Sequence, residues 1–231
     1  MDHSGHKQRL RDKMIKGGLE NFPPHEVLEV MLSFPIVRKN TNPLAHQLIQ
    51  KYGSLSAVLD ADYEELLTND GVGEKTAFFL KSIPALCRYY MLDKQSDKEA
   101  FDNSDIAGEY AAKLFVDKTK ECVYILCLDV GKRLINTVFI KEGGLASVEL
   151  CMRDIAAAAL SNNANSIILL HNHTTSMLQP SHSDLIATAK VIDAMDHIGI
   201  GFDDHIIVNK EGNYLSFEKS RLISVTKNLR P

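Results

Sequence analysis

The sequence predicts two domains of different class, an all-α N-terminal domain and a C-terminal α/β domain with a mixed sheet. Over residues 1–90, apolar side chains recur at helical spacing, as in Val27, Leu28, Met31 and Leu32, with no alternation of the β type. After a polar stretch, apolar runs of strand length alternate with helical segments. Strands that alternate with helices are typical of a sheet covered by helices.

The N-terminal domain is expected to span residues 1–95 and to consist of short helices. Pro23-Pro24 and Pro43 stand at the start of helical stripes, where proline is favoured because the first helical N–H groups have no partner within the helix. Residues 96–104 are polar and poor in apolar side chains, which is typical of a linker.

The C-terminal domain is expected over residues 105–231. Its first two strands are separated by Gly131-Lys132 and should form an antiparallel hairpin. The expected elements are, in order, strands over 122–129 and 134–141, a helix over 152–162, a strand over 166–171, a helix over 181–198 and a strand over 205–208.

Composition and charge narrow the function classes. The chain has 45% hydrophobic and 24% charged residues and a formal net charge of −4. Residues 1–100 carry 13 basic and 14 acidic side chains and residues 101–231 carry 13 and 16, so bulk charge gives no affinity for nucleic acid. The four cysteines are scattered without a C-x-x-C pair. With no signal-peptide pattern and no apolar run of membrane length, we expect a cytoplasmic protein that does not enter a membrane.

A metal-binding pattern follows the apolar strand expected over 166–171. His171 and His173 are two positions apart, so on a strand both imidazoles project to the same side. The next carboxylate downstream is Asp184, one helical turn after Ser181. Two imidazoles with a carboxylate suit a tetrahedral metal.

Each half of this pattern also has an explanation without a metal. Two histidines at i and i+2 occur by chance in many chains. Ser181 and Asp184 have the spacing of a capping box, in which the serine caps a helix and the acid at the third helical position returns the hydrogen bond. In that interpretation Asp184 stabilises the start of a helix and binds no metal.

The joint spacing, H-x-H, seven residues, Ser, two residues, Asp, matches the JAMM signature. The segment HNHTTSMLQPSHSD resembles the JAMM core of the bacterial RadC family of JAB/MPN proteins, and so do Arg153-Asp154-Ile155 and Asp204–Val208. The resemblance continues less specifically through the N-terminal half. It implies a JAB/MPN α/β domain with the three-layer arrangement of cytidine deaminases, and one zinc ion held by His171, His173 and Asp184.

The resemblance also implies two catalytic residues. Ser181 falls on the family's serine, which helps to stabilise the oxyanion. Glu121 falls on the catalytic glutamate just before the first strand, and would act as general base. On its sequence position alone, Glu121 is typical of a solvated residue at a strand edge, and Glu142 and Glu149 are competing candidates.

The implied activity is metal-dependent hydrolysis of an amide bond in a peptide or isopeptide substrate. Three protein ligands leave a fourth position for water, whose pKa the metal lowers, and a carboxylate moves the proton. One departure bears on turnover: Thr174-Thr175-Ser176 stands where the family has Pro-Ser-Gly. This changes the allowed dihedral angles of the loop and leaves the ligand positions untouched.

A second motif lies in the N-terminal half. Gly71, Gly73 and Lys75 resemble a helix-hairpin-helix motif, in which glycines let backbone N–H groups approach a DNA phosphate and the lysine adds a contact. A plain connector between helices explains the same glycines. RadC proteins carry a DNA-repair label, so the competing hypothesis is a catalytically silent accessory protein that binds DNA weakly through this hairpin.

Overall fold

The computed structural model describes residues 3–96, 100–143 and 148–227. By contacts, the chain divides into two compact units, Met1–Cys87 and Arg88–Pro231. Each unit is described by itself. In the described part of the chain, no helix is both long and apolar enough to cross a bilayer.

The N-terminal unit is helical, as predicted. Leu28, Leu48, Leu66 and Leu80 are fully buried at its centre, so the helical stripes read from the sequence form one core. The helices are α1 (His3–Gly17), α2 (Pro24–Leu32), α3 (Asn42–Tyr52), α4 (Leu55–Asp60), α5 (Tyr63–Leu67) and the first part of α6 (Glu74–Ser96).

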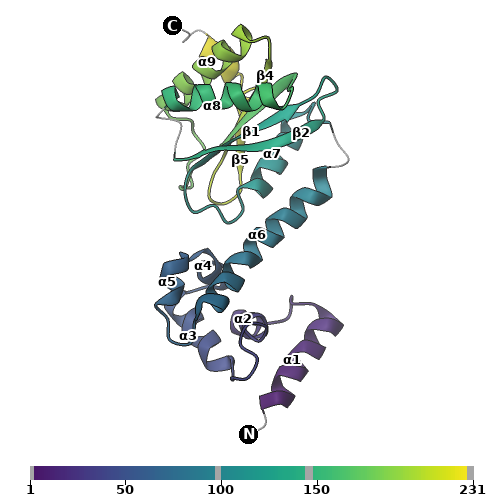
Figure 1. Cartoon of the computed structure of the whole chain (residues 1–231), viewed down its shortest axis with the longest axis vertical. Helices are drawn as coiled ribbons and strands as arrows, with labels where there is room; N and C mark the ends of the chain where they lie inside the picture. Colours follow the sequence, from purple (N-terminus) through teal and green to yellow (C-terminus); the bar gives the residue numbers. More distant parts are fainter. Residues whose placement is uncertain (1–2, 97–99, 144–147, 228–231) are drawn as a thin grey trace. The chain divides into compact units, whose positions relative to one another are not determined.

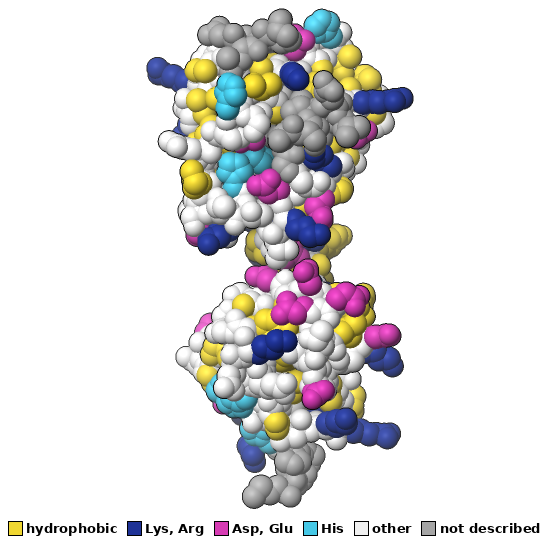
Figure 2. Space-filling view, turned by 90° about the vertical axis from the view of Figure 1, so that its left-hand side faces the viewer, with side chains coloured by type: hydrophobic (Ala, Val, Ile, Leu, Met, Phe, Trp, Pro, Cys, Tyr) yellow, Lys and Arg dark blue, Asp and Glu magenta, His cyan; other side chains and the backbone are white. Residues whose placement is uncertain are grey.

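The segment predicted as a helix-hairpin-helix motif includes the connection between α5 and α6. Gly71 adopts φ +88°, a left-handed conformation that a residue with a side chain rarely adopts. Gly73 and Lys75 are exposed at the start of α6. Acidic side chains gather on one part of the surface of this unit (Figure 2), and residues 60–74 contribute six exposed acids. The exposed acids of this region are Asp60, Asp62, Glu64, Glu65, Asp70 and Glu74.

The division between the units lies within α6, earlier in the chain than the linker expected over 96–104. The last part of α6 belongs to the C-terminal unit, because Arg88 pairs with Asp117 and Leu92 packs against the core of that unit. Phe101, inside the expected linker, is only 4% exposed in the same core. Apolar burial therefore ties Phe101 to the C-terminal unit.

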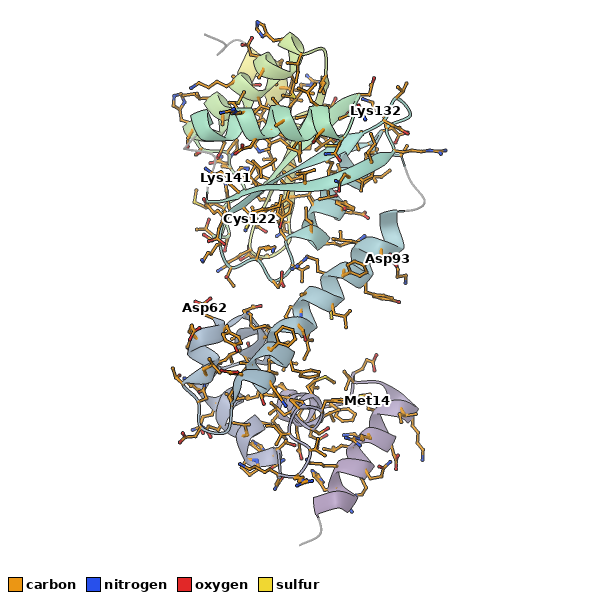
Figure 3. All side chains as sticks on the ribbon, viewed as in Figure 1. Met14, Asp62, Asp93, Cys122, Lys132 and Lys141 are labelled. Carbon is orange, nitrogen blue, oxygen red and sulfur yellow. The ribbon has the colours of Figure 1, made fainter. Side chains whose placement is uncertain are left out.

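The C-terminal unit is built on a five-stranded sheet in the order β2-β1-β3-β4-β5. Its strands are β1 (Cys122–Leu128), β2 (Leu134–Glu142), β3 (Ser166–Asn172), β4 (Gly201–Val208) and β5 (Tyr214–Ser216). β3 and β4 are parallel, and the other neighbours are antiparallel. In Figure 3, Cys122 and Lys141 mark one end of the β1–β2 hairpin and Lys132 the other. The predicted mixed sheet is confirmed.

Helices cover both faces of this sheet and make three layers (Figure 1). On one face lie α8 (Val148–Ser161) and α9 (His182–His197), and on the other α7 (Ser104–Leu114). The pleat of β3 divides its side chains between the two cores. Ile167 and Leu169 pack under α8 and α9, whereas Ile168 and Leu170 pack under α7. The side chains at the carboxyl end of β3 therefore alternate between the same two faces.

Three described elements have no counterpart in the sequence-based expectations: α7, β5 and α10 (Leu222–Lys227). Gly108, in the middle of α7, lies against the ring of Tyr214 in β5, and a Cβ at this glycine would overlap the ring. Glycine lowers helix propensity, so the residue that permits this close packing also weakens the helical pattern in the sequence.

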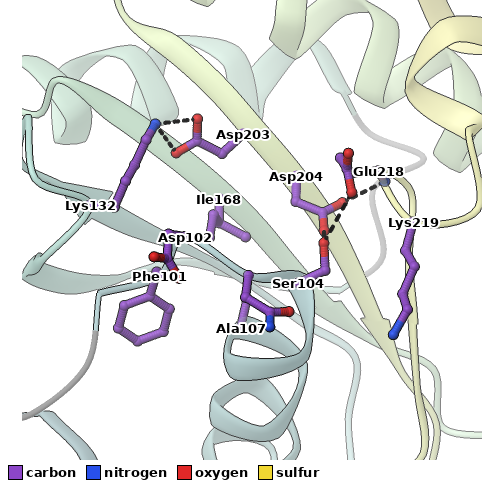
Figure 4. A pocket seen from close by; sticks show the side chains of 11 residues that line it. Phe101, Asp102, Ser104, Ala107, Lys132, Ile168, Asp203, Asp204, Glu218 and Lys219 are labelled. Carbon is purple, nitrogen blue, oxygen red and sulfur yellow. Dashed lines mark hydrogen bonds and ion pairs between the residues drawn. The ribbon is translucent and has the colours of Figure 1, made fainter.

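The carboxylate of Asp204, on β4, organises the α7 side of the sheet (Figure 4). It is only 3% exposed. Its Oδ2 accepts hydrogen bonds from the hydroxyls of Ser104 (2.9 Å) and Ser216 (2.5 Å). Its Oδ1 accepts from the backbone N–H groups of His205 (2.7 Å) and Glu218 (2.9 Å). One side chain thus joins the start of α7 to β4 and to the segment after β5.

We predict that Asp204→Ala lowers the free energy of unfolding of the C-terminal unit by about 2–3 kcal/mol, because four donors lose a buried acceptor. Amide hydrogen exchange in β4 measures this loss. Asp154→Ala, at an exposed position of α8, is the control and should leave exchange in β4 nearly unchanged. Equal protection in the two variants would contradict the role given to Asp204.

Candidate metal centre

His171 and His173 lie at the carboxyl end of β3, on the face covered by α8 and α9. His171 continues the row formed by Ile167 and Leu169 and is 1% exposed. The backbone N–H of His173 donates to the carbonyl of Val208 at 2.7 Å, which keeps the chain extended beyond the last strand residue. Both imidazoles therefore project to the same side, as the sequence predicts.

Asp184 comes from the first turn of α9 and meets the two histidines. Its Oδ1 lies 3.6 Å from Nε2 of His171, and its Oδ2 lies 3.5 Å from Nε2 of His173. One ligand atom from each of the three residues lies within 4.8 Å of the other two. The structure thus brings together the three residues predicted as metal ligands.

The donor set fits a tetrahedral ion. Zinc bonds of about 2.0–2.1 Å at tetrahedral angles separate neighbouring ligand atoms by roughly 3.3 Å. Each nitrogen–oxygen distance is close to that value but ends on a different carboxylate oxygen. The three ligand atoms lie within 4.8 Å of one another, so the side chains would have to close further around an ion. The Nδ1 of His173 lies 3.0 Å from the carbonyl oxygen of Met177. Since a carbonyl only accepts, Nδ1 carries the hydrogen and Nε2 of the neutral ring keeps its lone pair toward Asp184.

Burial and charge set the protonation of the cluster. Burial lowers the pKa of His171 to about 4, against the opposing effect of the Asp184 charge. The pKa of His173 is raised, because the protonated ring gains a hydrogen bond to Asp184 through Nε2, and the Glu121 charge adds to this. Burial opposes ionisation of Asp184, but His173, His171 and Ser181 together hold its pKa well below the usual range. A neutral imidazole beside a carboxylate is the form that binds a cation.

The capping box is present as well. Ser181 caps α9, and its hydroxyl accepts from the backbone N–H of Asp184 at 3.2 Å. The Oδ2 of Asp184 accepts from the backbone N–H of Ser181 at 2.8 Å and from its hydroxyl at 2.7 Å. The cap engages Oδ2 and leaves Oδ1 toward His171. The structural role of Asp184 is therefore compatible with metal binding.

Asn172, between the two histidines, faces the opposite way and bonds both sides of Glu121. Its side-chain oxygen accepts from the backbone N–H of Cys122 at 2.7 Å, and its amide donates to the carbonyl of Lys120 at 3.0 Å. The backbone carbonyl of Glu121 accepts from the N–H of Gly143 at 2.7 Å. Three bonds thus hold the chain at Glu121 beside the histidines, where its charge acts on His173.

The competing glutamates are placed differently. Glu142 is exposed at the end of β2 and pairs with Lys120 at 2.8 Å. The side chain of Glu149 lies outside the described residues. Gly71, Gly73 and Lys75 belong to the N-terminal unit.

The loop over 174–176, where the sequence departs from the family pattern, is held by hydrogen bonds to the turn after β4. The carbonyl of Thr175 accepts from the N–H of Lys210 at 3.2 Å. The carbonyl of Ser176 accepts from the amide of Asn209 at 2.9 Å, and its hydroxyl donates to Glu211 at 2.6 Å. These contacts fix the backbone without the proline and glycine of the family pattern.

Sequence reasoning gave no role to His205 and Thr188. The Nδ1 of His171 lies 2.8 Å from Nε2 of His205, and the Nδ1 of His205 lies 2.7 Å from the hydroxyl of Thr188. His205 stands at the start of the strand expected over 205–208, and Thr188 lies one turn after Asp184 in α9. Their contacts link β3, β4 and α9, so no local spacing in the sequence pointed to them.

A cavity of about 570 Å³ lies elsewhere in this unit, on the α7 side of the sheet. Asp203, Asp204 and Lys132 line it, together with the start of α7 (Figure 4). None of the three clustered ligands lines it. The histidine cluster, whose donors could hold a metal ion and whose pKa values are shifted, is the candidate functional site.

We predict that His173 in the metal-free protein titrates above the ordinary histidine pKa, whereas His171 stays neutral down to about pH 4. Asp184→Asn should lower the pKa of His173, because it removes the adjacent negative charge. NMR of the ring nitrogens across a pH series measures both. Asp193→Asn, on the same helix, is the control, and an equal effect of the two variants would contradict the assignment.

The same shifts give stability slopes of opposite sign. The raised pKa of His173 contributes stability that is full below the unfolded value and is lost as pH rises through the folded value. The lowered pKa of His171 contributes stability that is present above 6.5 and is lost as pH falls toward about 4.

Comparisons with known proteins cover most of the chain. A family model described as RadC-like JAB domain matches residues 101–222, and one described as UPF0758 N-terminal matches residues 1–78. The UPF0758 protein FN0909 of Fusobacterium nucleatum is 31% identical over 96% of this chain and 98% of its own length. The UPF0758 protein SPO0054 of Ruegeria pomeroyi is 30% identical over 89% of this chain and 92% of its own. The chain belongs to the RadC-like JAB domain family, with a UPF0758 N-terminal domain before the JAB domain.

Proposed function

We propose that the chain is a zinc-dependent hydrolase of amide bonds, with a peptide or isopeptide substrate. The observation that carries the proposal is the cluster of His171, His173 and Asp184, whose ligand atoms lie within 4.8 Å of one another. Two imidazoles and a carboxylate are a donor set of catalytic zinc sites, in which a fourth position stays open. Membership of a JAB family supports the same class of site.

The roles of the three ligands follow from their neighbours. His171 is buried and neutral, His173 is half-buried at the opening, and Asp184 supplies the negative charge. Zinc bound here would lower the pKa of a water in its open position and polarise the substrate carbonyl. Asp184 lies in the first turn of α9, where the positive end of the helix dipole stabilises its negative charge.

Glu121 is the proposed general base. It is half-buried beside His173, and its charge reaches that ring. A carboxylate there would take a proton from the attacking water and return it to the leaving amine. Ser181 is the proposed oxyanion donor. Its hydroxyl donates to Oδ2 of Asp184 at 2.7 Å, so this role requires the hydroxyl to turn from the carboxylate to the substrate.

His171→Ala should abolish stoichiometric zinc binding, because only two ligands remain. Elemental analysis after loading with zinc and desalting measures the metal content of each variant. His182→Ala is the matched control, since it removes an exposed imidazole at the start of α9. Wild type and the control should each hold one zinc per chain. Equal zinc in His171→Ala and wild type would refute the site.

Glu121→Gln should keep zinc and lose amide hydrolysis by roughly 10²–10⁴-fold, the usual effect of removing a general base. Glu142→Gln is the matched control, because Glu142 is an exposed glutamate at the neighbouring strand end. Turnover of a fluorogenic peptide-amide library measures both variants. Zinc-loaded wild type without turnover, or equal loss in the two variants, would contradict the assignment of Glu121.

Weak DNA binding through Gly71, Gly73 and Lys75 stays a prediction. The left-handed Gly71 suits such a hairpin. The six exposed acids of residues 60–74 would repel a phosphate backbone, and Lys75 is the one basic side chain among residues 60–75. The hydrolase is the function that the described contacts favour.

A further inference from the structure

A chain of buried polar side chains runs from His171 back to the helix that carries Asp184. His171 contacts His205 at 2.8 Å, and His205 contacts the hydroxyl of Thr188 at 2.7 Å. That hydroxyl lies 2.6 Å from the backbone carbonyl oxygen of Asp184. His171 is 1% exposed, and His205 and Thr188 are 0% exposed. Each polar atom in this chain must be satisfied by its neighbour, since water does not reach it.

The direction of each hydrogen bond in this chain is determined by its last member. A backbone carbonyl only accepts, so the single hydroxyl hydrogen of Thr188 points to the Asp184 carbonyl. The same hydroxyl therefore accepts from Nδ1 of His205. With its hydrogen on Nδ1, the neutral His205 ring presents a lone pair at Nε2. That lone pair accepts from Nδ1 of His171.

We infer that Thr188 and His205 are positioning residues that fix His171 in the tautomer with its hydrogen on Nδ1. In this tautomer Nε2 of His171 keeps its lone pair toward Asp184, as a metal ligand requires. The opposite tautomer would place a hydrogen on the nitrogen that faces the site. The part of this inference that concerns metal rests on the proposed function, whereas the tautomer is a property of the metal-free protein.

We call the hydrogen-bonded series from His171 through His205 to Thr188 the relay. Packing holds its middle member, His205, in place. The backbone N–H of His205 donates to Asp204, and its carbonyl accepts from the N–H of Phe217 at 3.0 Å. The Phe217 ring lies against the His205 ring, with centroids 4.4 Å apart. The His205 ring is therefore confined between Phe217 and His171, and a flip would need the surrounding core to open.

His173 reaches the same tautomer by a simpler route. Its Nδ1 hydrogen is accepted by the carbonyl of Met177 at 3.0 Å, in a loop at the surface. His171 lies deeper, where its Nδ1 meets another imidazole. The Nε2 of His205 can either donate to His171 or accept from it. His205 therefore fixes the tautomer of His171 only if a further group fixes the tautomer of His205. Thr188 is that group.

The test compares Thr188→Val with Thr188→Ser. Valine keeps the shape of the threonine side chain and removes the hydroxyl, whereas serine keeps the hydroxyl. Long-range proton–nitrogen NMR of the metal-free protein identifies the tautomer of each histidine. Wild type and Thr188→Ser should show His171 with hydrogen on Nδ1. Thr188→Val should populate the Nε2–H form of His171 and weaken zinc binding by about 10–100-fold, measured by competition with a chromogenic chelator.

Thr226→Val is the matched control. Thr226 is also fully buried, and its hydroxyl donates to the carbonyl of Ile223 at 2.8 Å in α10. This variant should keep the wild-type tautomer and zinc affinity, so a loss common to both valine variants would overturn the inference.

The wild-type spectrum decides the question even if Thr188→Val fails to fold, because His171 with its hydrogen on Nε2 would overturn the inference directly. A wild type that has the Nδ1–H tautomer and binds no zinc would refute the proposed function and leave the relay standing. An unchanged tautomer in folded Thr188→Val would overturn the relay alone.

Discussion

The candidate centre depends on the alternation of side chains at the end of β3. His171 and His173 face α9 because they continue the row of Ile167 and Leu169, and Asn172 faces the other side. A shift of one residue in the pairing of β3 would exchange the two sets. The apolar residues under each helix layer therefore fix which atoms meet Asp184 and which hold the chain at Glu121.

The first turn of α9 has a structural role that suits the proposed metal-binding one. The Asp184 carboxylate closes the capping box through Oδ2, which orients the side chain before any ligand arrives. A carboxylate held by two hydrogen bonds loses little rotational freedom on binding a cation, and preorganisation of this kind favours affinity. The two interpretations of the Ser181–Asp184 spacing, a helix cap and a metal ligand, therefore support each other.

The sequence was informative wherever a feature is local or periodic. β1 and β3 are apolar runs, and α9 begins with a capping box. The spacing of His171 and His173 follows from a strand, and that of Ser181 and Asp184 from one helical turn. α7 was not predicted, because Gly108 lowers the helix propensity of this segment. The glycine is explained by a tertiary contact, the close packing of the Tyr214 ring against it.

His205 and Thr188 were not predicted because their roles depend on tertiary contacts. In the sequence, His205 and Thr188 look like ordinary strand and helix residues. Their contacts exist only because β4 pairs with β3 and α9 packs on the same face of the sheet. The role of Asn172 was not predicted for the same reason, since its hydrogen-bond partners lie about 50 residues earlier in the chain, on either side of Glu121. Such contacts carry no periodic signal in a single sequence.

The composition of the core around β4 also bears on function. Burying polar groups costs free energy unless each is fully hydrogen-bonded, and well-packed apolar residues serve stability at least as well. The α9 face of this sheet nevertheless places His171, His205 and Thr188 among aliphatic side chains such as Val191. Stability alone gives no reason for two imidazoles at this depth. A metal site gives such a reason, because it needs the Nε2 lone pair of His171 in a fixed direction. The buried relay excludes the tautomer of His171 that cannot bind a metal.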